Sequence, residues 1–153
     1  MKIGKVIAVI GSCLVVLGTV FVLFFQQNEK HSNLSSPHLE VKANKEEIAA
    51  KKGAYCWSEN EQSVCTDTED PASNLDQSYE IHAVSDLEAE LVFNNSPEKI
   101  EIERRDEDGR WEKQLMKDNS YFQLPDSEGT YVYRVAAQWE QGNVTYAFRV
   151  VTE

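Results

Sequence analysis

Basic residues are scarce in this chain of 153 residues, which has 15 Lys and Arg against 26 Asp and Glu. Every acidic residue and 13 of the basic residues follow Phe25, so residues 26–153 carry a formal net charge of −13 (13 − 26). Nucleic acids and anionic lipid surfaces are bound through Lys and Arg, so this balance argues against both as partners of residues 26–153. The charge suits a soluble surface and permits attraction to cations or basic partners.

The sequence also lacks the short motifs that accompany common catalytic and cofactor sites. It contains no G-x-S-x-G, no G-x-x-x-x-G-K-[ST], no G-x-G-x-x-G and no H-E-x-x-H. The acidic segment 67–77 lacks the EF-hand spacing, and we interpret it as a solvated loop. His82 is expected to be a surface residue of a strand rather than part of a catalytic triad. We therefore predict no catalytic residue, no cofactor and no metal ligand, and a chain that is not an enzyme.

Charged residues are absent from one long segment, residues 6–25, which is apolar almost throughout. Twenty helical residues at about 1.5 Å each match a hydrocarbon core of about 30 Å. Lys2 and Lys5 precede this segment, and the positive-inside bias then places Met1 in the cytoplasm. We predict that residues 1–25 are a short cytoplasmic start and a transmembrane anchor, with the rest of the chain extracytoplasmic in a single-pass cell membrane protein.

Two other interpretations of the N-terminal segment also predict that the same domain is exported. A cleaved signal peptide would give a secreted protein, but such signals have a shorter apolar region and a small-residue cleavage site. Residues 10–13 resemble a lipoprotein box, in which Cys13 would be lipidated. In a retained helix, Cys13 is a small apolar residue inside the bilayer.

Residues 26–43 read as a polar tether, because they are rich in Ser and Asn. A short helix is then expected over residues 44–53, with Asn44 as its N-cap, Glu47 completing a capping box and Gly53 ending it. This helix and a following hairpin make up residues 44–77, which we expect to pack on a sandwich formed by residues 78–153.

Cysteine is rare, with three in the chain, and two of them lie in a candidate hairpin. If Asn60-Glu61 is a two-residue turn, counting outward places Cys56 opposite Cys65 in a non-hydrogen-bonded pair, where side chains are closest. An exported domain favours a disulfide there, worth on the order of 2–3 kcal/mol. Two free thiols, a redox pair or a longer loop are the alternatives.

From residue 79 onward, apolar and polar residues alternate in short runs separated by turn residues. Alternating runs with turns every 8–12 residues and no long amphipathic helix predict an antiparallel β-sandwich in a mainly β chain. Helices over residues 87–93 and 110–118 are the main alternative. The expected strands lie within residues 79–85, 87–93, 100–103, 111–116, 121–124, 131–139 and 144–150.

The segment S-E-G-T-Y-V-Y at residues 127–133 looks like the penultimate strand of immunoglobulin-like (Ig-like) sandwiches. Gly129 stands two residues before Tyr131, and that spacing suits a tyrosine corner in which the Tyr131 hydroxyl turns back to the preceding loop. With the G-A-Y-C-W and V-C-T-D segments, residues 50–153 resemble small exported proteins of Gram-positive, Bacillus-type bacteria, which combine a membrane or lipid anchor with one Ig-like domain. The resemblance implies an Ig-like fold without the usual intersheet disulfide, since Tyr133 stands where antibody domains have Cys. It supplies no catalytic residue.

Aromatic residues are numerous for a small sandwich, and three tryptophans are candidate contacts. If Trp57, Trp111 and Trp139 were exposed on one sheet, they could bind a glycan or a protein; the alternative is that they fill the core. The leading hypothesis is a non-catalytic, membrane-anchored Ig-like module that contacts an envelope protein or a wall component. The alternatives are an extracytoplasmic ligand- or cation-binding sensor that uses the acidic loops, or an enzyme.

Overall fold

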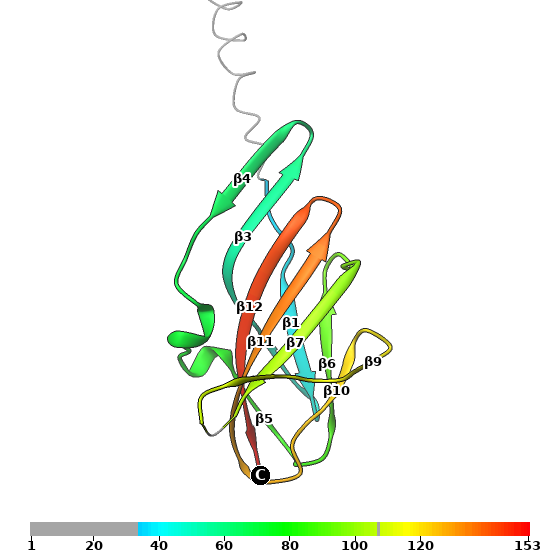
Figure 1. Cartoon of the computed structure of the whole chain (residues 1–153). Helices are drawn as coiled ribbons and strands as arrows, with labels where there is room; N and C mark the ends of the chain where they lie inside the picture. Colours follow the sequence, from blue (N-terminus) through cyan, green and yellow to red (C-terminus); the bar gives the residue numbers. More distant parts are fainter. Residues whose placement is uncertain (1–33, 107) are drawn as a thin grey trace, which may run out of the picture. The chain divides into compact units, whose positions relative to one another are not determined.

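Strands dominate the computed structural model, which describes residues 34–106 and 108–153 (Figure 1). The described residues form one compact unit, Leu34–Glu153. The predicted anchor at residues 6–25, Cys13 and residues 26–33 of the predicted tether lie outside them. Among the described residues, no helix is long and apolar enough to cross a membrane. In chain order, the described elements are β1 (Leu39–Ala43), β2 (Glu46–Ala49), β3 (Lys51–Glu59), β4 (Gln62–Thr66), the 3-10 helices η1 (Pro71–Ser73) and η2 (Gln77–Tyr79), β5 (Glu80–Ala83), β6 (Glu88–Phe93), β7 (Lys99–Arg105), β8 (Trp111–Lys113), β9 (Met116–Lys117), β10 (Tyr121–Gln123), β11 (Gly129–Trp139) and β12 (Gly142–Thr152).

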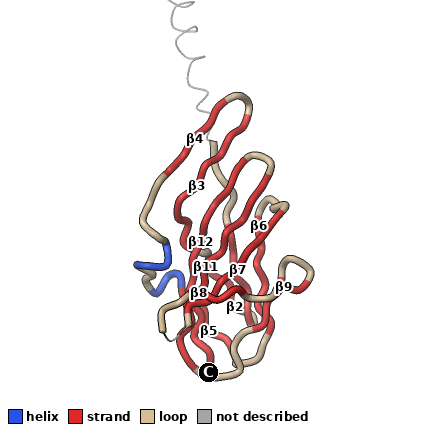
Figure 2. The backbone as a smooth tube through the Cα atoms, viewed as in Figure 1, coloured by secondary structure: helices blue, strands red, loops and turns tan. Residues whose placement is uncertain are grey.

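The strands form two sheets that enclose one core (Figure 2). Sheet A has the order β2-β1-β6-β10-β9, and sheet B has the order β4-β3-β12-β11-β7-β8. All neighbours along these two paths are antiparallel, while β5 pairs in parallel with the C-terminal part of β12. The prediction of a mainly β chain with two antiparallel sheets is therefore confirmed.

The chain passes between the sheets through very short connections. Ala50 alone separates β2 in sheet A from β3 in sheet B, and its amide donates to the Leu39 carbonyl at 2.9 Å. Gln114 and Leu115 alone separate β8 at the edge of sheet B from β9 at the edge of sheet A. The expected strand over residues 111–116 is thus two strands, one in each sheet.

The core lies between the sheets because apolar residues alternate along each strand. Tyr133 and Phe148 are stacked with their ring centroids 5.2 Å apart, and the Phe122 ring of sheet A lies 5.1 Å from Tyr133. The prediction that alternate residues of β11 and β12 share one face is confirmed by their burial. The large side chains that are completely buried are Tyr133, Tyr146, Phe122, Phe148, Leu39, Ile81, Ile102, Leu124, Val41, Val135, Val144 and Val150.

The helix predicted over residues 44–53 is wrong, because the chain forms the β1–β2 hairpin there. Asn44 and Lys45 form its turn with φ angles of 52° and 95°, and Lys42 faces Glu47 across the hairpin with an ion pair of 2.7 Å. The capping pattern was favourable for a helix, but about two helical turns need tertiary support, whereas β1 offers residues 46–49 a partner strand and β12 pairs with residues 51 and 52.

The predicted tether also extends too far, since β1 belongs to sheet A. Leu39, Val41 and Ala43 are buried in the core, while Glu40 is exposed and Lys42 half-buried. The alternation of these five residues is a strand signal that the Ser-rich and Asn-rich composition of residues 26–38 obscured.

Gly53, which was predicted to end the helix, lies inside β3 where η1 crosses sheet B. A Cβ atom at this position would lie 2.6 Å from the Pro71 ring and 2.7 Å from Thr145 Oγ1. The absence of a side chain at Gly53 therefore lets the segment after β4 pack directly against the sheet.

Candidate functional site

Two of the three candidate interaction tryptophans lie in the core. Trp57 and Trp139 are each 4% exposed, and their rings meet edge to face with centroids 5.5 Å apart. Phe93 packs against Trp139, and Trp139 Nε1 donates to the Asn95 carbonyl at 2.9 Å. Both tryptophans are therefore structural, and the hypothesis of a three-tryptophan contact surface is wrong.

Trp111 lies on the outer face of sheet B, between two arginines. The guanidinium of Arg134 is 4.4 Å from the ring centroid and that of Arg105 is 4.8 Å away, so both are within cation–π distance. The Trp111 side chain is half-buried, next to a small apolar cluster centred on Ala72, Leu75 and Ala147. This tryptophan orders charged side chains on the outer face of the sheet.

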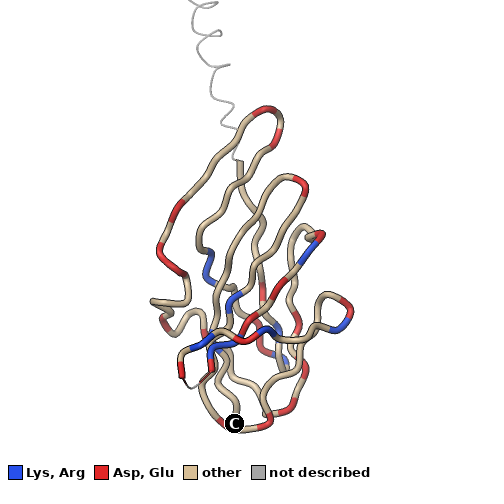
Figure 3. The backbone as a smooth tube through the Cα atoms, in the orientation of Figure 1, with Lys and Arg blue, Asp and Glu red and all other residues tan. Residues whose placement is uncertain are grey.

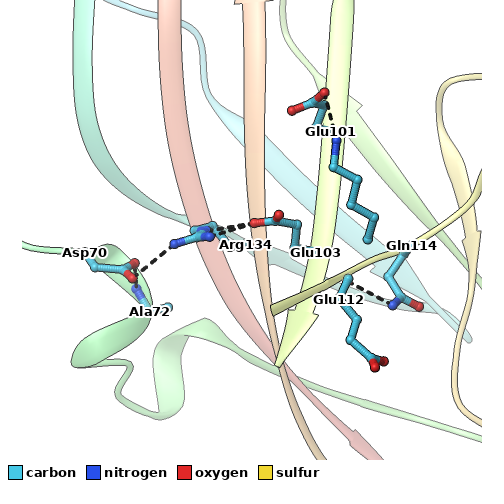
Figure 4. Close-up of polar contacts among 8 residues, drawn as sticks. Asp70, Ala72, Glu101, Glu103, Glu112, Gln114 and Arg134 are labelled. Atoms are coloured by element: carbon cyan, nitrogen blue, oxygen red, sulfur yellow. Dashed lines mark hydrogen bonds and ion pairs between the residues drawn. The ribbon is translucent and has the colours of Figure 1, made fainter. Parts of the chain in front are cut away.

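Arg134 links β7 to the segment that follows β4. Its Nη2 lies 2.6 Å from Glu103 Oε2 and its Nη1 lies 3.5 Å from Asp70 Oδ2, so it reaches a carboxylate on either side (Figure 4). Nearby on the same face, Lys113 pairs with Glu101 at 3.4 Å. The outer face of sheet B carries alternating, mutually neutralised charges, which suits a solvated surface better than a reaction centre.

The acidic segment 67–77 exposes its acidic side chains, as predicted for a solvated loop, but it also forms η1 and η2, which pack on sheet B (Figure 2). Asp70 accepts the Ala72 amide at 3.0 Å and Asp76 accepts the Ser78 amide at 2.8 Å, so both carboxylates cap 3-10 helices. The hydrogen bonds from Ser78 lower the pKa of Asp76. These two carboxylates are therefore occupied by local backbone structure.

The predicted tyrosine hydrogen bond to the preceding loop is present. Tyr131 Oη donates to the Ser127 carbonyl at 3.2 Å and lies 2.8 Å from Ser127 Oγ. A Cβ atom on Gly129 would lie 3.3 Å from the Tyr131 ring, which accounts for glycine two residues earlier. Burial raises the pKa of Tyr133 to about 12, with the Arg104 charge opposing the rise, and within the described residues its hydroxyl has no hydrogen-bond partner.

The surface next to Tyr131 includes a hollow of about 380 Å³. Arg104 and Arg105 line it, and Arg104 lies 5.4 Å from the centroid of the Tyr131 ring. Asp106, Asp126 and Glu128 line the same hollow, so three carboxylates offset the two guanidinium charges. This balance gives the hollow no preference for anions.

The cysteine pairing predicted from the turn is confirmed. Asn60 and Glu61 form a two-residue turn, Cys56 faces Cys65 with a Cα–Cα distance of 4.1 Å, and the two are joined by a disulfide. Within the unit Leu34–Glu153, the turns after β3, β6 and β11 lie at the end opposite the C-terminus (Figure 1). Acidic residues mark the tips of the β3–β4 and β11–β12 hairpins (Figure 3).

His82 is half-exposed on β5, as predicted for a surface residue. Its ring nitrogens lie 3.4 Å from carboxylate oxygens of Glu80 and Glu153. Across residues 34–106 and 108–153, no group of three or more His, Cys, Asp or Glu side chains is placed to hold a metal ion. The histidine is thus a surface group between two acids.

Comparison of the chain with models of protein families, with curated proteins and with solved structures finds no match.

Proposed function

We propose that this chain is a membrane-anchored, extracytoplasmic Ig-like module that contacts an envelope protein or a wall component and catalyses no reaction. The observation that carries the proposal is the Cys56–Cys65 disulfide in a hairpin whose two cysteines are both exposed. Disulfides persist in oxidising compartments, and an exposed one would be reduced in a cytosol. The hairpin therefore supports the proposal of export, as does the apolar segment 6–25.

The Ig-like part of the proposal is supported by the Tyr131 hydrogen bonds to Ser127 at the start of β11. The same contact, a tyrosine hydroxyl bonded a few residues upstream, is characteristic of Ig-like sandwiches. Two antiparallel sheets around a core agree with this assignment, and among the described residues no disulfide joins the two sheets. A rigid sandwich of this kind displays loops and edges, which is how such modules make contacts.

Export is tested by labelling a surface cysteine in intact cells that express the full chain. Leu115 is 94% exposed, so Leu115→Cys in a Cys13→Ser background should react with a membrane-impermeant maleimide. Val135→Cys in the same background is the matched control, because Val135 is completely buried and should react only after denaturation. Labelling of Leu115→Cys only after lysis would place the domain in the cytoplasm and overturn the proposal.

The mode of anchoring is tested with Cys13→Ser alone. If residues 6–25 form a retained helix, the variant stays in the membrane fraction and neither protein incorporates labelled fatty acid. Release of the variant, together with lipid labelling of the wild type, would establish the lipoprotein alternative.

Contact with a partner is tested by in vivo photo-crosslinking from membranes. A photoreactive residue is placed singly at exposed positions on both sheets, with Val135 as the buried control. The proposal expects a discrete adduct with an envelope protein or wall polymer from a contiguous set of positions. Absence of adducts at every exposed position would overturn the interaction function.

A further inference from the structure

We propose that the outer edge of β4 is a docking site for an extended, basic peptide segment of the partner, which adds to sheet B as a further strand. This inference rests on the proposed function and assigns it a surface and a partner chemistry. Among the described residues, β4 pairs with β3 alone and forms one end of sheet B (Figure 1).

The register shows which backbone groups of β4 face outward. Because Asn60-Glu61 closes the turn, the pair Trp57:Val64 exchanges hydrogen bonds and the pair Cys56:Cys65 does not. Ser63 and Cys65 therefore direct their N–H and C=O groups away from β3, and within the described residues no hydrogen bond occupies them. Two residues on the same edge give four backbone groups in the pattern that an added strand pairs with.

The other sheet ends are closed or guarded in the ways that natural proteins use. Glu46 at the β2 end of sheet A accepts the His82 amide of β5 at 3.1 Å, which ties that end to the neighbouring strand. The β8 and β9 ends are only three and two residues long, and each contains a lysine. In contrast, β4 contains neither a charged residue nor a proline.

The disulfide holds this edge in place for binding. Both cysteines are exposed, and Val64 is the half-buried apolar residue of β4 that packs against the core, so burial alone holds the strand weakly. The bond keeps β4 against β3 in one register. An ordered edge loses less conformational entropy on binding, because the strand is already extended.

Carboxylates at both ends of β4 indicate a basic occupant. Glu59 and Glu61 lie at the hairpin tip, and Asp67 and Glu69 follow the strand (Figure 3). None of these four makes an ion pair within the described part of the chain, so their charges are available to an incoming Lys or Arg. A second copy of this chain would bring like charges together at the same edge, which disfavours self-pairing.

The test uses the full-length ¹⁵N-labelled chain in zwitterionic micelles and the synthetic peptide acetyl-Lys-Val-Lys-Val-Lys-Val-amide. At saturating peptide, hydrogen exchange of the Ser63 and Cys65 amides should slow at least about tenfold, whereas the Val64 amide, already bonded to β3, should change little. An N-methylated peptide that cannot donate these bonds, and the peptide with Glu in place of Lys, should each bind at least about tenfold more weakly. Equal binding of either control peptide, or protection at other residues, would overturn the proposal.

A matched pair of variants distinguishes the contribution of the Ser63 backbone N–H to peptide binding from that of the Ser63 side chain. Ser63→Pro removes one outward N–H without breaking the β3 ladder and should weaken peptide binding about tenfold, while Ser63→Ala keeps the N–H and should bind as wild type. If Ser63→Pro loses the native amide spectrum, Glu59→Gln with Glu61→Gln replaces it and should weaken binding and its salt dependence.

The photo-crosslinking experiment distinguishes failure of this inference from failure of the proposed function. Adducts from other exposed positions but none from residue 63 would overturn the proposal that the partner docks on the β4 edge. The proposal that the chain contacts a partner would be kept. No adduct from any position would overturn both.

Discussion

Three tyrosines in the second half of the sandwich place their hydroxyl groups in different environments. Tyr131 donates to Ser127 near the surface, and Tyr146 donates to the Pro37 carbonyl at 2.9 Å in the core. The Tyr133 hydroxyl is buried without a hydrogen-bond partner among the described residues. The same substitution, Tyr to Phe, should therefore have different effects at these sites.

Replacing Tyr131 with Phe removes both contacts to Ser127 and keeps the ring. We expect the free energy of unfolding to fall by about 1 kcal/mol, because Ser127 Oγ loses its hydrogen-bond partner, while the Ser127 carbonyl still accepts a hydrogen bond from Thr152 Oγ1 at 2.7 Å. Urea denaturation at pH 7 measures the change. The control is Tyr55→Phe, whose hydroxyl has no hydrogen bond within the described residues and whose loss should change stability by less than about 0.5 kcal/mol. An equal loss of stability in Tyr131→Phe and Tyr55→Phe would show that the Tyr131 contact does not stabilise the fold.

Replacing Tyr133 with Phe should leave stability at pH 7 unchanged or raise it, since an unpaired buried hydroxyl is removed. In the wild type, the folded pKa of about 12 exceeds the ordinary value of 10.0, so the folded state binds more protons between these pH values. The contribution of the Tyr133 hydroxyl to the free energy of unfolding is fully present below pH 10. It is lost as the pH rises through about 12, and the loss is on the order of 2 kcal/mol. Burial raises the pKa of Tyr146 in the same direction.

Unfolding followed from pH 8 to pH 12 checks this prediction. Tyr133→Phe should show a shallower alkaline loss of stability than the wild type. An unchanged slope in Tyr133→Phe would show that the Tyr133 hydroxyl does not control alkaline unfolding.

At the scale of elements, the β3–β4 hairpin differs from the rest of sheet B in how it is held. Its inner face contributes Trp57 to the core, whereas β4 itself has little buried surface. Gly142 permits close packing of β12 against β3, since a Cβ atom there would overlap the Cys56 carbonyl at 2.0 Å. The inner strand is thus fixed by packing and the outer strand by the disulfide.

Replacing Cys56 and Cys65 together with Ser should lower the free energy of unfolding by about 2–3 kcal/mol. The reason is that the bond closes a short loop, with a sequence separation of 9, in the unfolded chain. Thermal melting measures the loss, and hydrogen exchange should show the largest increase in β4. Reductant should destabilise the wild type and leave the double variant unaffected. A similar response of both proteins to reductant would mean that the disulfide does not contribute.

At the scale of the whole molecule, the excess of acidic residues makes binding of divalent cations the first alternative function to test. Asp70 and Asp76 cap 3-10 helices, and Glu103 and Glu80 are paired with Arg134 and Arg149. Several carboxylates that a cation sensor would use are thus already engaged. Divalent cations are then expected to affect the net charge only through general ionic screening.

We therefore expect calcium and magnesium chlorides at equal concentration to change the melting temperature equally. Differential scanning fluorimetry of the full-length chain from 0.1 to 10 mM of each salt checks this expectation. A rise of more than about 2 °C with calcium but not with magnesium would support the cation-sensor alternative instead.

Local patterns in the sequence predicted the parts of the fold that depend on residues near each other in the chain. Alternation along residues 131–139 and 144–150 identified the buried faces of β11 and β12. Counting outward from the Asn60-Glu61 turn predicted the Cys56–Cys65 pair, because hairpin register is set by the turn. The Tyr131 contact spans four residues and was predicted from the resemblance of residues 127–133 to a strand of Ig-like sandwiches.

Tertiary structure decided the rest. Residues 46–49 have the composition of a helix start, yet they form β2 because β1 offers a partner strand that local propensity does not register. Alternation assigned Trp57 and Trp139 to particular faces but could not tell whether another layer covers those faces, and both are buried. Local sequence patterns were sufficient to predict which residues share a face and that Cys56 lies opposite Cys65, since both depend on a period of two and a nearby turn. Which faces are covered, and which edge is left open, were decided by contacts between segments far apart in the chain.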